Sequence, residues 1–196
     1  MTARIAEISR KTAETDITAS INLDGSGKSV IATGIPFMDH MLTLFAKHGF
    51  FDLNVSAKGD LEVDCHHTME DLGIVLGDLL AKAAGDKSGI RRYGNFLLPM
   101  DETLVMIALD LSGRGGLYYD VTPPAQQLNN IDTRLFHEFF QSFAVRSGLN
   151  LHIRMIVSCE THHLFEAIFK GLAKALDQAL SFDERVKGVL STKGSL

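Results

Sequence analysis

Apolar residues along the chain follow two different periods. They recur every three or four positions over residues 71–85 and 167–180, which predicts two amphipathic helices. Shorter stretches alternate apolar and polar residues and end in Gly-containing turns such as LDGSG (23–27), which predicts strands joined by hairpins. This mixture predicts an α+β fold in which helices pack on one face of a mainly antiparallel sheet.

The same order of elements occurs twice. Three segments of the first half resemble three of the second: ETDITASINLDGSG and ETLVMIALDLSGRG, HMLTLFAKHGFFDLNV and EFFQSFAVRSGLNLHI, HHTMED and HHLFEA. The predicted order in each half is a strand, an optional second strand, a helix, a strand and a helix. We therefore predict a tandem duplication with halves at residues 1–90 and 91–196 that form one compact unit. The halves meet in GDKSGIRRYG (85–94).

Composition narrows the class of protein. The net charge of −5 makes the whole molecule a poor partner for nucleic acid, so an anionic ligand needs a local cluster of Lys and Arg. The N-terminus lacks the apolar core of a secretory signal, and no apolar stretch is long enough to span a membrane. The two cysteines, Cys65 and Cys159, do not form a disulfide framework and fit small buried hydrophobic residues better than metal ligands. We expect a cytoplasmic globular protein.

Half of the eight histidines stand in two adjacent pairs. In a helix, His66 and His67 lie four and three residues before Glu70, so imidazole and carboxylate groups share a face. The second half repeats this frame at His162, His163 and Glu166. Such nitrogen and oxygen donors suit Mn, Fe, Zn or Ni, and the frame has no thiolates typical of structural zinc. A histidine-rich surface that binds metal adventitiously is the alternative, and the duplication argues against it.

A further ligand position lies upstream of each pair. His40 alone would be interpreted as a hydrogen-bonded core residue, but its repeat counterpart is a carboxylate, Glu138, with His137 beside it. We predict two similar metal sites, each with one ligand set. The two sets are His40, His66, His67 and Glu70, and Glu138, His162, His163 and Glu166.

Several of these segments are typical of one family. In their order along the chain they are TGIPFMDHML, DCHHTMED, LDLSGRG, HEFFQS, THHLFEAIFKG and STKG. With them the chain resembles the imidazoleglycerol-phosphate dehydratases over nearly its whole length. The resemblance implies a duplicated fold (ribosomal protein S5 domain 2-like) and a homo-oligomer, about 24 subunits in the family, with active sites at subunit interfaces. It also implies two Mn(II) ions per active site, held by the eight residues of the two ligand sets, with His137 as the alternative to Glu138.

The resemblance further implies the reaction and the residues that bind its substrate. The substrate would be D-erythro-imidazoleglycerol phosphate, dehydrated to imidazole acetol phosphate in histidine biosynthesis. Arg and Lys suit its phosphate as bidentate donors and point charges. The substrate-binding residues implied are Glu14, His40, His48, Arg92, Arg114, Lys170, Ser191, Thr192 and Lys193.

The chemistry requires an electron sink, because the carbon that loses a proton has no neighbouring carbonyl. Paired Lewis-acidic ions on the two ring nitrogens would stabilise an imidazolate and then a diazafulvene intermediate. The catalytic carboxylates predicted are Glu14, which would move the proton, with Glu70 and Glu166. Glu102, the repeat partner of Glu14, leaves open that this acid is structural in both halves.

Two other classes of protein are compatible with the same ligands. A metal-dependent hydrolase of a phosphorylated small molecule would release phosphate. A non-catalytic metal-binding assembly protein would not need Arg114, Lys170 or Lys193.

Overall fold

The computed structural model describes residues 3–196, which form two halves of the same design. The first half consists of β1 (Ile5–Lys11), β2 (Thr15–Asn22), β3 (Ser29–Ala32), α1 (Pro36–Gly49), β4 (Asp52–Gly59) and α2 (His66–Ala84). The second consists of β5 (Tyr93–Met100), β6 (Thr103–Asp110), β7 (Gly116–Asp120), β8 (Gln127–Leu128), β9 (Ile131–Asp132), α3 (Leu135–Ser147), β10 (Asn150–Val157) and α4 (Thr161–Leu180). The predicted α+β class and the tandem duplication are confirmed.

Each half contains one four-stranded sheet with the same topology. The strand order is β1-β2-β4-β3 in the first sheet and β5-β6-β10-β7 in the second. In both sheets the first three strands are antiparallel and the last is parallel to its neighbour. The hairpin predicted at residues 23–27 is wrong, because β2 and β3 are not neighbours and this turn leads across the sheet to the far edge.

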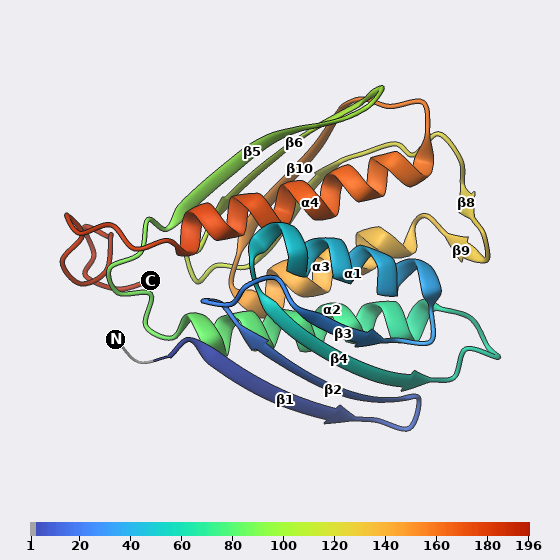
Figure 1. The fold of residues 1–196 in the computed structure, drawn as a ribbon, viewed down its shortest axis with the longest axis horizontal. Helices are drawn as coiled ribbons and strands as arrows, with labels where there is room; N and C mark the ends of the chain where they lie inside the picture. The colour runs from blue at the N-terminus through green and yellow to red at the C-terminus, as the bar shows by residue number, and fades with distance from the viewer. Residues whose placement is uncertain (1–2) are drawn as a thin grey trace.

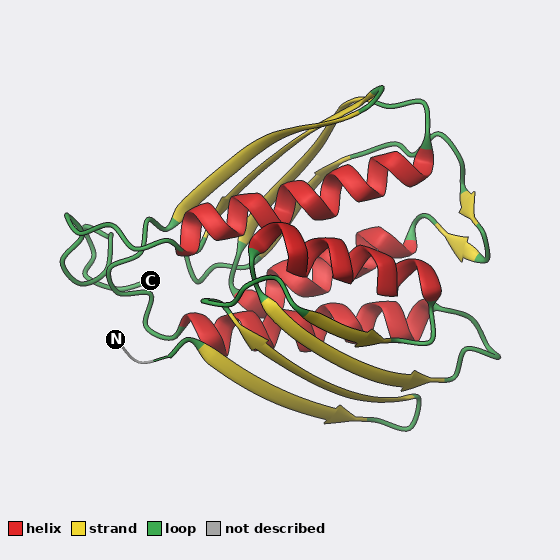
Figure 2. Ribbon diagram, in the orientation of Figure 1, coloured by secondary structure: helices red, strands yellow, loops and turns green. Residues whose placement is uncertain are grey.

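The helices lie between the two sheets (Figures 1 and 2). Helix α2 covers β1 and β2, and α4 covers β5 and β6. Alternation in β2 turns Ile17, Ala19 and Ile21 toward the helices, and β6 contributes its buried residues in the same way. Helices of different halves also pair, α1 with α4 and α2 with α3. The two halves therefore share one hydrophobic core.

The pairing of α2 with α3 depends on two glycines. A Cβ added at Gly73 would lie 2.4 Å from the carbonyl oxygen of Phe139, and one at Gly77 would lie 2.7 Å from that of Phe143. Any larger residue would push the helices apart. The two helix backbones therefore approach closely only because these positions carry no side chain.

All four helices begin at the same end of the molecule, on the right of Figure 1. The segment after α4 and the junction between the halves lie at the opposite end, on the left. Within residues 3–196, no helix is long and apolar enough to cross a membrane. The shared direction of the helices decides where the candidate ligands meet.

Candidate metal centre

Three candidate ligands from both halves converge at the helix N-termini. His40 Nε2, on α1, lies 2.7 Å from Glu166 Oε1 on α4, and His162 Nε2 lies 3.4 Å from the same oxygen. One donor atom from each of the three residues lies within 4.8 Å of the others. Two imidazoles and a carboxylate this close suit a divalent transition-metal ion.

Neighbouring side chains hold this cluster in place. The Phe37 ring packs edge-on against the His162 ring at 5.1 Å and against the His40 ring at 6.5 Å. Lys170 Nζ donates to Glu166 Oε2 at 2.7 Å. Burial raises the pKa of Glu166, but the hydrogen bonds from Lys170 and His40 outweigh it and hold that pKa at about 2. The carboxylate is therefore ionised at neutral pH and available to a cation.

The second histidine of each pair points elsewhere, since successive residues of a helix lie about 100° apart. His67 Nδ1 lies 2.9 Å from Asp60 Oδ2, and His163 Nδ1 lies 3.1 Å from Glu102 Oε2. The hydrogen bond with Asp60 raises the pKa of His67, and that with Glu102 raises the pKa of His163. Asp101, Glu102 and His163 also form a second group of close donor atoms.

The remaining predicted ligands lie near the same end without forming a third group among the described residues. His66 Nε2 lies 3.7 Å from Glu70 Oε2 on α2. At the start of α3, His137 Nδ1 lies 3.1 Å from Glu138 Oε1, and both side chains are half exposed. Either could serve as a ligand there, as the sequence left open.

Within one chain the candidate ligands group differently from the two predicted sets. His40 does not lie with His66 of its own half but with His162 and Glu166 of the other. The reason is that α1 packs on α4 across the molecule. By the same symmetry α3, which carries Glu138, packs on α2, which carries His66.

The predicted proton-moving acid lies beside the first histidine pair. Glu14 Oε1 is 3.7 Å from His67 Nε2, and the Glu14 side chain is 52% exposed. Its backbone NH donates to Thr12 Oγ1, but no hydrogen bond engages its carboxylate within residues 3–196. The Glu14 carboxylate is therefore open to solvent on the side away from His67.

The predicted substrate-binding residues do not meet in one place. Arg92 Nε and Nη2 donate to the Asp110 carboxylate and Nη1 donates to the carbonyl of Leu190. Arg92 lines a cavity of about 790 Å³ with Ser191 and Thr192, while Lys193 lies exposed in the following turn.

Arg114 lies at the same end of the molecule as the cavity lined by Arg92. Its neighbour Gly113 lies against the chain terminus, because a Cβ added at Gly113 would lie 2.9 Å from the carboxyl carbon of Leu196. Four predicted residues lie apart from this end, and two of them, Glu14 and His40, belong to the histidine end described above. Lys170 lies at the histidine cluster. His48 lies in the last turn of α1, the helix that packs on α4, and its pKa is lowered by burial and by the charges of Lys170 and Lys174.

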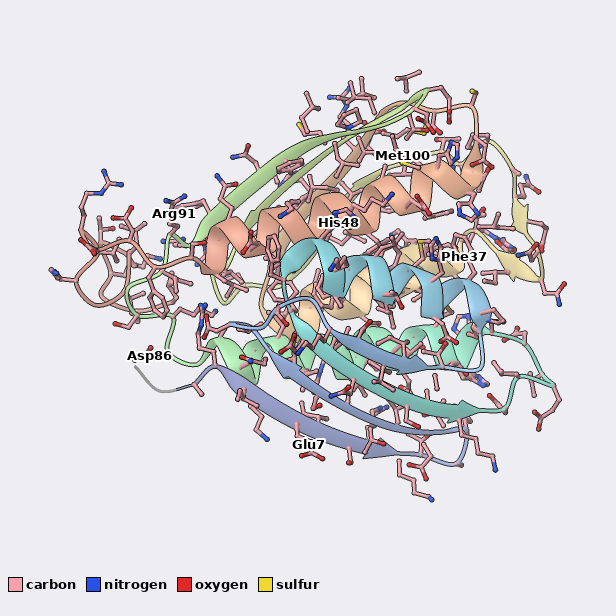
Figure 3. The ribbon with its side chains drawn as sticks, viewed as in Figure 1. Glu7, Phe37, His48, Asp86, Arg91 and Met100 are labelled. Atoms are coloured by element: carbon pink, nitrogen blue, oxygen red, sulfur yellow. The ribbon has the colours of Figure 1, made fainter. Side chains whose placement is uncertain are left out.

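The histidine cluster and the tail cavity lie at opposite ends of α4. The backbone NH of Arg92 donates to the carbonyl of Ala179, which follows Glu166 by more than three helical turns. At 1.5 Å per residue that separation is about 20 Å. In Figure 3 the labelled Phe37 lies toward the histidine end and the labelled Arg91 toward the opposite end. One small substrate cannot contact both ends of one chain.

Several residues around the histidines were not predicted from the sequence. Asp60 precedes His67 by seven positions and gave no periodic signal. Phe37 was visible only as an apolar residue of the first helix. Asp71 lies directly after the first frame, and its repeat counterpart is Ala167, a difference that could have been noticed.

Comparison with known proteins gives consistent matches. The family model described as imidazoleglycerol-phosphate dehydratase matches residues 33–176. The protein of that name from Acetivibrio thermocellus is 57% identical over 190 residues, covering 97% of each chain. The one from Caldanaerobacter subterraneus is 56% identical over 193 residues, covering 98% of this chain and all of the relative.

Two solved structures share the fold. Imidazoleglycerol-phosphate dehydratase from Staphylococcus aureus matches with a TM-score of 0.83 and 39% identity, covering 91% of this chain and 99% of that chain. IGPD from Pyrococcus furiosus matches with a TM-score of 0.82 and 36% identity, covering 96% of this chain and 100% of that chain. The likeness extends over both halves.

Proposed function

This chain belongs to the imidazoleglycerol-phosphate dehydratase family, lyases of histidine biosynthesis, and we propose that it dehydrates D-erythro-imidazoleglycerol phosphate to imidazole acetol phosphate with paired Mn(II) ions. The observation that carries the proposal is the convergence of His40, His162 and Glu166. Both cysteines are free thiols in the structure, which supports a reducing compartment such as the cytoplasm.

The donor atoms of this chain fit the metal that the family implies. His40, His162 and Glu166 would hold one ion, and by the repeat symmetry His66, Glu70 and the Glu138 position would contribute to a second. Bound ions would supply Lewis acidity to the imidazole ring of the substrate. Lys170 supports the first set by keeping Glu166 ionised.

The proton is moved by a carboxylate that is not committed elsewhere. Glu166 is a poor proton acceptor at neutral pH because its pKa is about 2, so its role is that of a ligand. Glu14 has an exposed carboxylate close to His67 and no hydrogen-bond donor on it among residues 3–196. We assign to Glu14 the proton transfer at the hydroxyl-bearing carbons of the substrate.

A complete active site requires more than one subunit. The residues proposed to bind the phosphate, Arg92, Ser191 and Thr192, lie about 20 Å along α4 from the metal cluster. A neighbouring subunit that presents its tail end to the histidine end would bring the two sets together. We therefore propose a homo-oligomer with active sites at subunit interfaces.

The test is to strip the protein of metal and restore it in stages. Protein treated with a chelator should be inactive, and added Mn(II) should restore formation of the enolisable ketone, followed by its ultraviolet absorbance. The phosphate ester should stay intact. Metal-loaded protein that makes no ketone would refute the proposal, and release of inorganic phosphate would instead indicate a hydrolase.

A further inference from the structure

Two histidines at the helix end have their ring orientation set by a carboxylate. His163 Nδ1 lies 3.2 and 3.1 Å from the two oxygens of Glu102, and His67 Nδ1 lies 2.9 Å from Asp60 Oδ2. Because an ionised carboxylate only accepts hydrogen bonds, Nδ1 carries the proton in both rings. Each ring then keeps Nε2 as its free donor atom, the arrangement in which a histidine binds a metal with support from an acid behind it.

We propose that Glu102 is a positioning residue that orients His163 for metal binding, and that Asp60, not Glu14, has this role for His67. The inference rests on the metal-dependent function proposed above. Glu14 and Glu102 occupy equivalent positions in the two repeats, in ETDI and ETLV. The proposal therefore assigns different roles to two acids that the sequence treats as a pair.

Glu102 is fixed in place by a chain of hydroxyl groups. Thr103 Oγ1, on a residue only 1% exposed, donates to Glu102 Oε1 at 2.9 Å. Because Thr103 gives its single hydroxyl proton to Glu102, Ser158 Oγ is the donor in its 2.8 Å contact with Thr103 Oγ1. This chain joins the start of β6 to the segment before α4. It holds Glu102 against His163.

The first half lacks this chain because its threonine has another partner. Thr15, the repeat counterpart of Thr103, donates to Asp71 on α2, which also accepts from Arg10 Nε at 3.0 Å. In α4 the position of Asp71 is occupied by Ala167, which offers no acceptor. Thr103 therefore turns to Glu102, whereas Glu14 receives no hydrogen bond from Thr15.

Glu14 and Glu102 therefore have different roles. Both oxygens of Glu102 are engaged by His163, so Glu102 does not approach the substrate as a free base. The Glu14 carboxylate stays free, and His67 is held from its other side by Asp60. Loss of a positioning residue should be compensated by more metal, whereas loss of the proton-transfer residue should not.

Metal affinity is the first measurement. The full-length assembly is titrated with Mn(II), and free Mn(II) is followed by electron paramagnetic resonance. Glu102→Ala should weaken binding about 10- to 100-fold, the usual effect of removing the acid behind a metal-bound histidine. Glu102→Gln should recover most of the affinity, since its amide oxygen still accepts from Nδ1. Glu62→Ala, which removes an exposed acid of the loop before α2, is the matched control and should bind as wild type does.

Turnover at rising Mn(II) is the second measurement. Excess Mn(II) should restore most of the activity of Glu102→Ala, whereas Glu14→Ala should bind Mn(II) normally and stay inactive at any concentration. Circular dichroism checks that each variant is folded.

Three results would overturn the proposal. The first is that Glu102→Ala binds Mn(II) with wild-type affinity. The second is that Glu102→Gln loses as much Mn(II) affinity as Glu102→Ala, which would make Glu102 a direct ligand. The third is that the wild-type protein binds no Mn(II). If wild type binds Mn(II) without dehydrating the substrate, the proposed function fails while the affinity comparison still decides the role of Glu102.

Discussion

The two halves share every main element and the same sheet topology, yet they differ in how polar side chains are paired. In the first half Asp71 on α2 accepts from Thr15 and Arg10. In the second half Ala167 stands at that position, and Glu166 beside it is instead paired with Lys170. The comparison teaches that a duplicated backbone can keep its geometry while single side chains change which carboxylates are bound and which are free.

The largest effect is expected from the acids that end the two histidine frames. Glu166 is 8% exposed and bonded to Lys170 and His40, whereas the Glu70 side chain is 46% exposed. Glu166→Gln should lower the unfolding free energy of the metal-free protein by about 2–3 kcal/mol, because Lys170 loses its charged partner in a largely buried place. Glu70→Gln should change it by less than about 1 kcal/mol.

Urea denaturation of both metal-free variants measures this difference. Equal losses in the two variants would show that the halves are energetically equivalent and that the pairing with Lys170 contributes nothing.

The halves could be predicted from sequence because each carries its own periodic pattern and its own histidine frame. The α2 and α4 periods marked the helices, and the repeated frame marked the end at which ligands gather. The grouping of ligands within the chain was not visible in the sequence, since His40 meets Glu166 only through packing between halves. No local pattern encodes this packing of α1 on α4, or the close approach of α2 to α3 at Gly73 and Phe139.

The hydrogen-bond partners of the carboxylates could not be predicted from the sequence either. Thr103 donates to Glu102, but its counterpart Thr15 donates to Asp71 on α2 and leaves Glu14 without this hydrogen bond. The tail residues were identified by resemblance, but their separation from the histidines needs three-dimensional structure.

Lowering the pH should remove the stability that the pairing of Glu166 gives to the second half. The pKa of Glu166 is about 2, below its ordinary value of 4.5, so its pairing stabilises the folded chain fully above about pH 4.5. This stabilisation is lost as the pH falls toward 2, where the folded state also takes up the proton. The gap of about 2–3 kcal/mol between wild type and Glu166→Gln should therefore close over that range.

Urea titrations of metal-free protein at stepped pH would record the closing gap. A gap that stays constant from pH 6 down to the onset of acid unfolding would contradict the assigned ion pair.

The smallest effect is expected at a buried phenol of the second half. Tyr119 on β7 corresponds to Ile31 on β3, and its hydroxyl is buried with no hydrogen-bond partner among the described residues. Burial raises the pKa of Tyr119. Tyr119→Phe removes an unsatisfied polar group, so it should leave stability unchanged or raise it by up to about 1 kcal/mol.

Thermal unfolding of Tyr119→Phe beside wild type measures this effect. A clear fall in melting temperature would show that the hydroxyl is satisfied in the folded protein, for example by an ordered water.

The length of α4 has a consequence for mixed populations of this protein. A chain damaged only near Glu166 keeps an intact tail, and a chain damaged only near Arg92 keeps intact histidines, about 20 Å away. If active sites form at subunit interfaces as proposed, refolding the two inactive variants together should join the intact end of one chain to the intact end of the other at some interfaces. Activity should reappear by complementation in such hybrids, although neither parent has any.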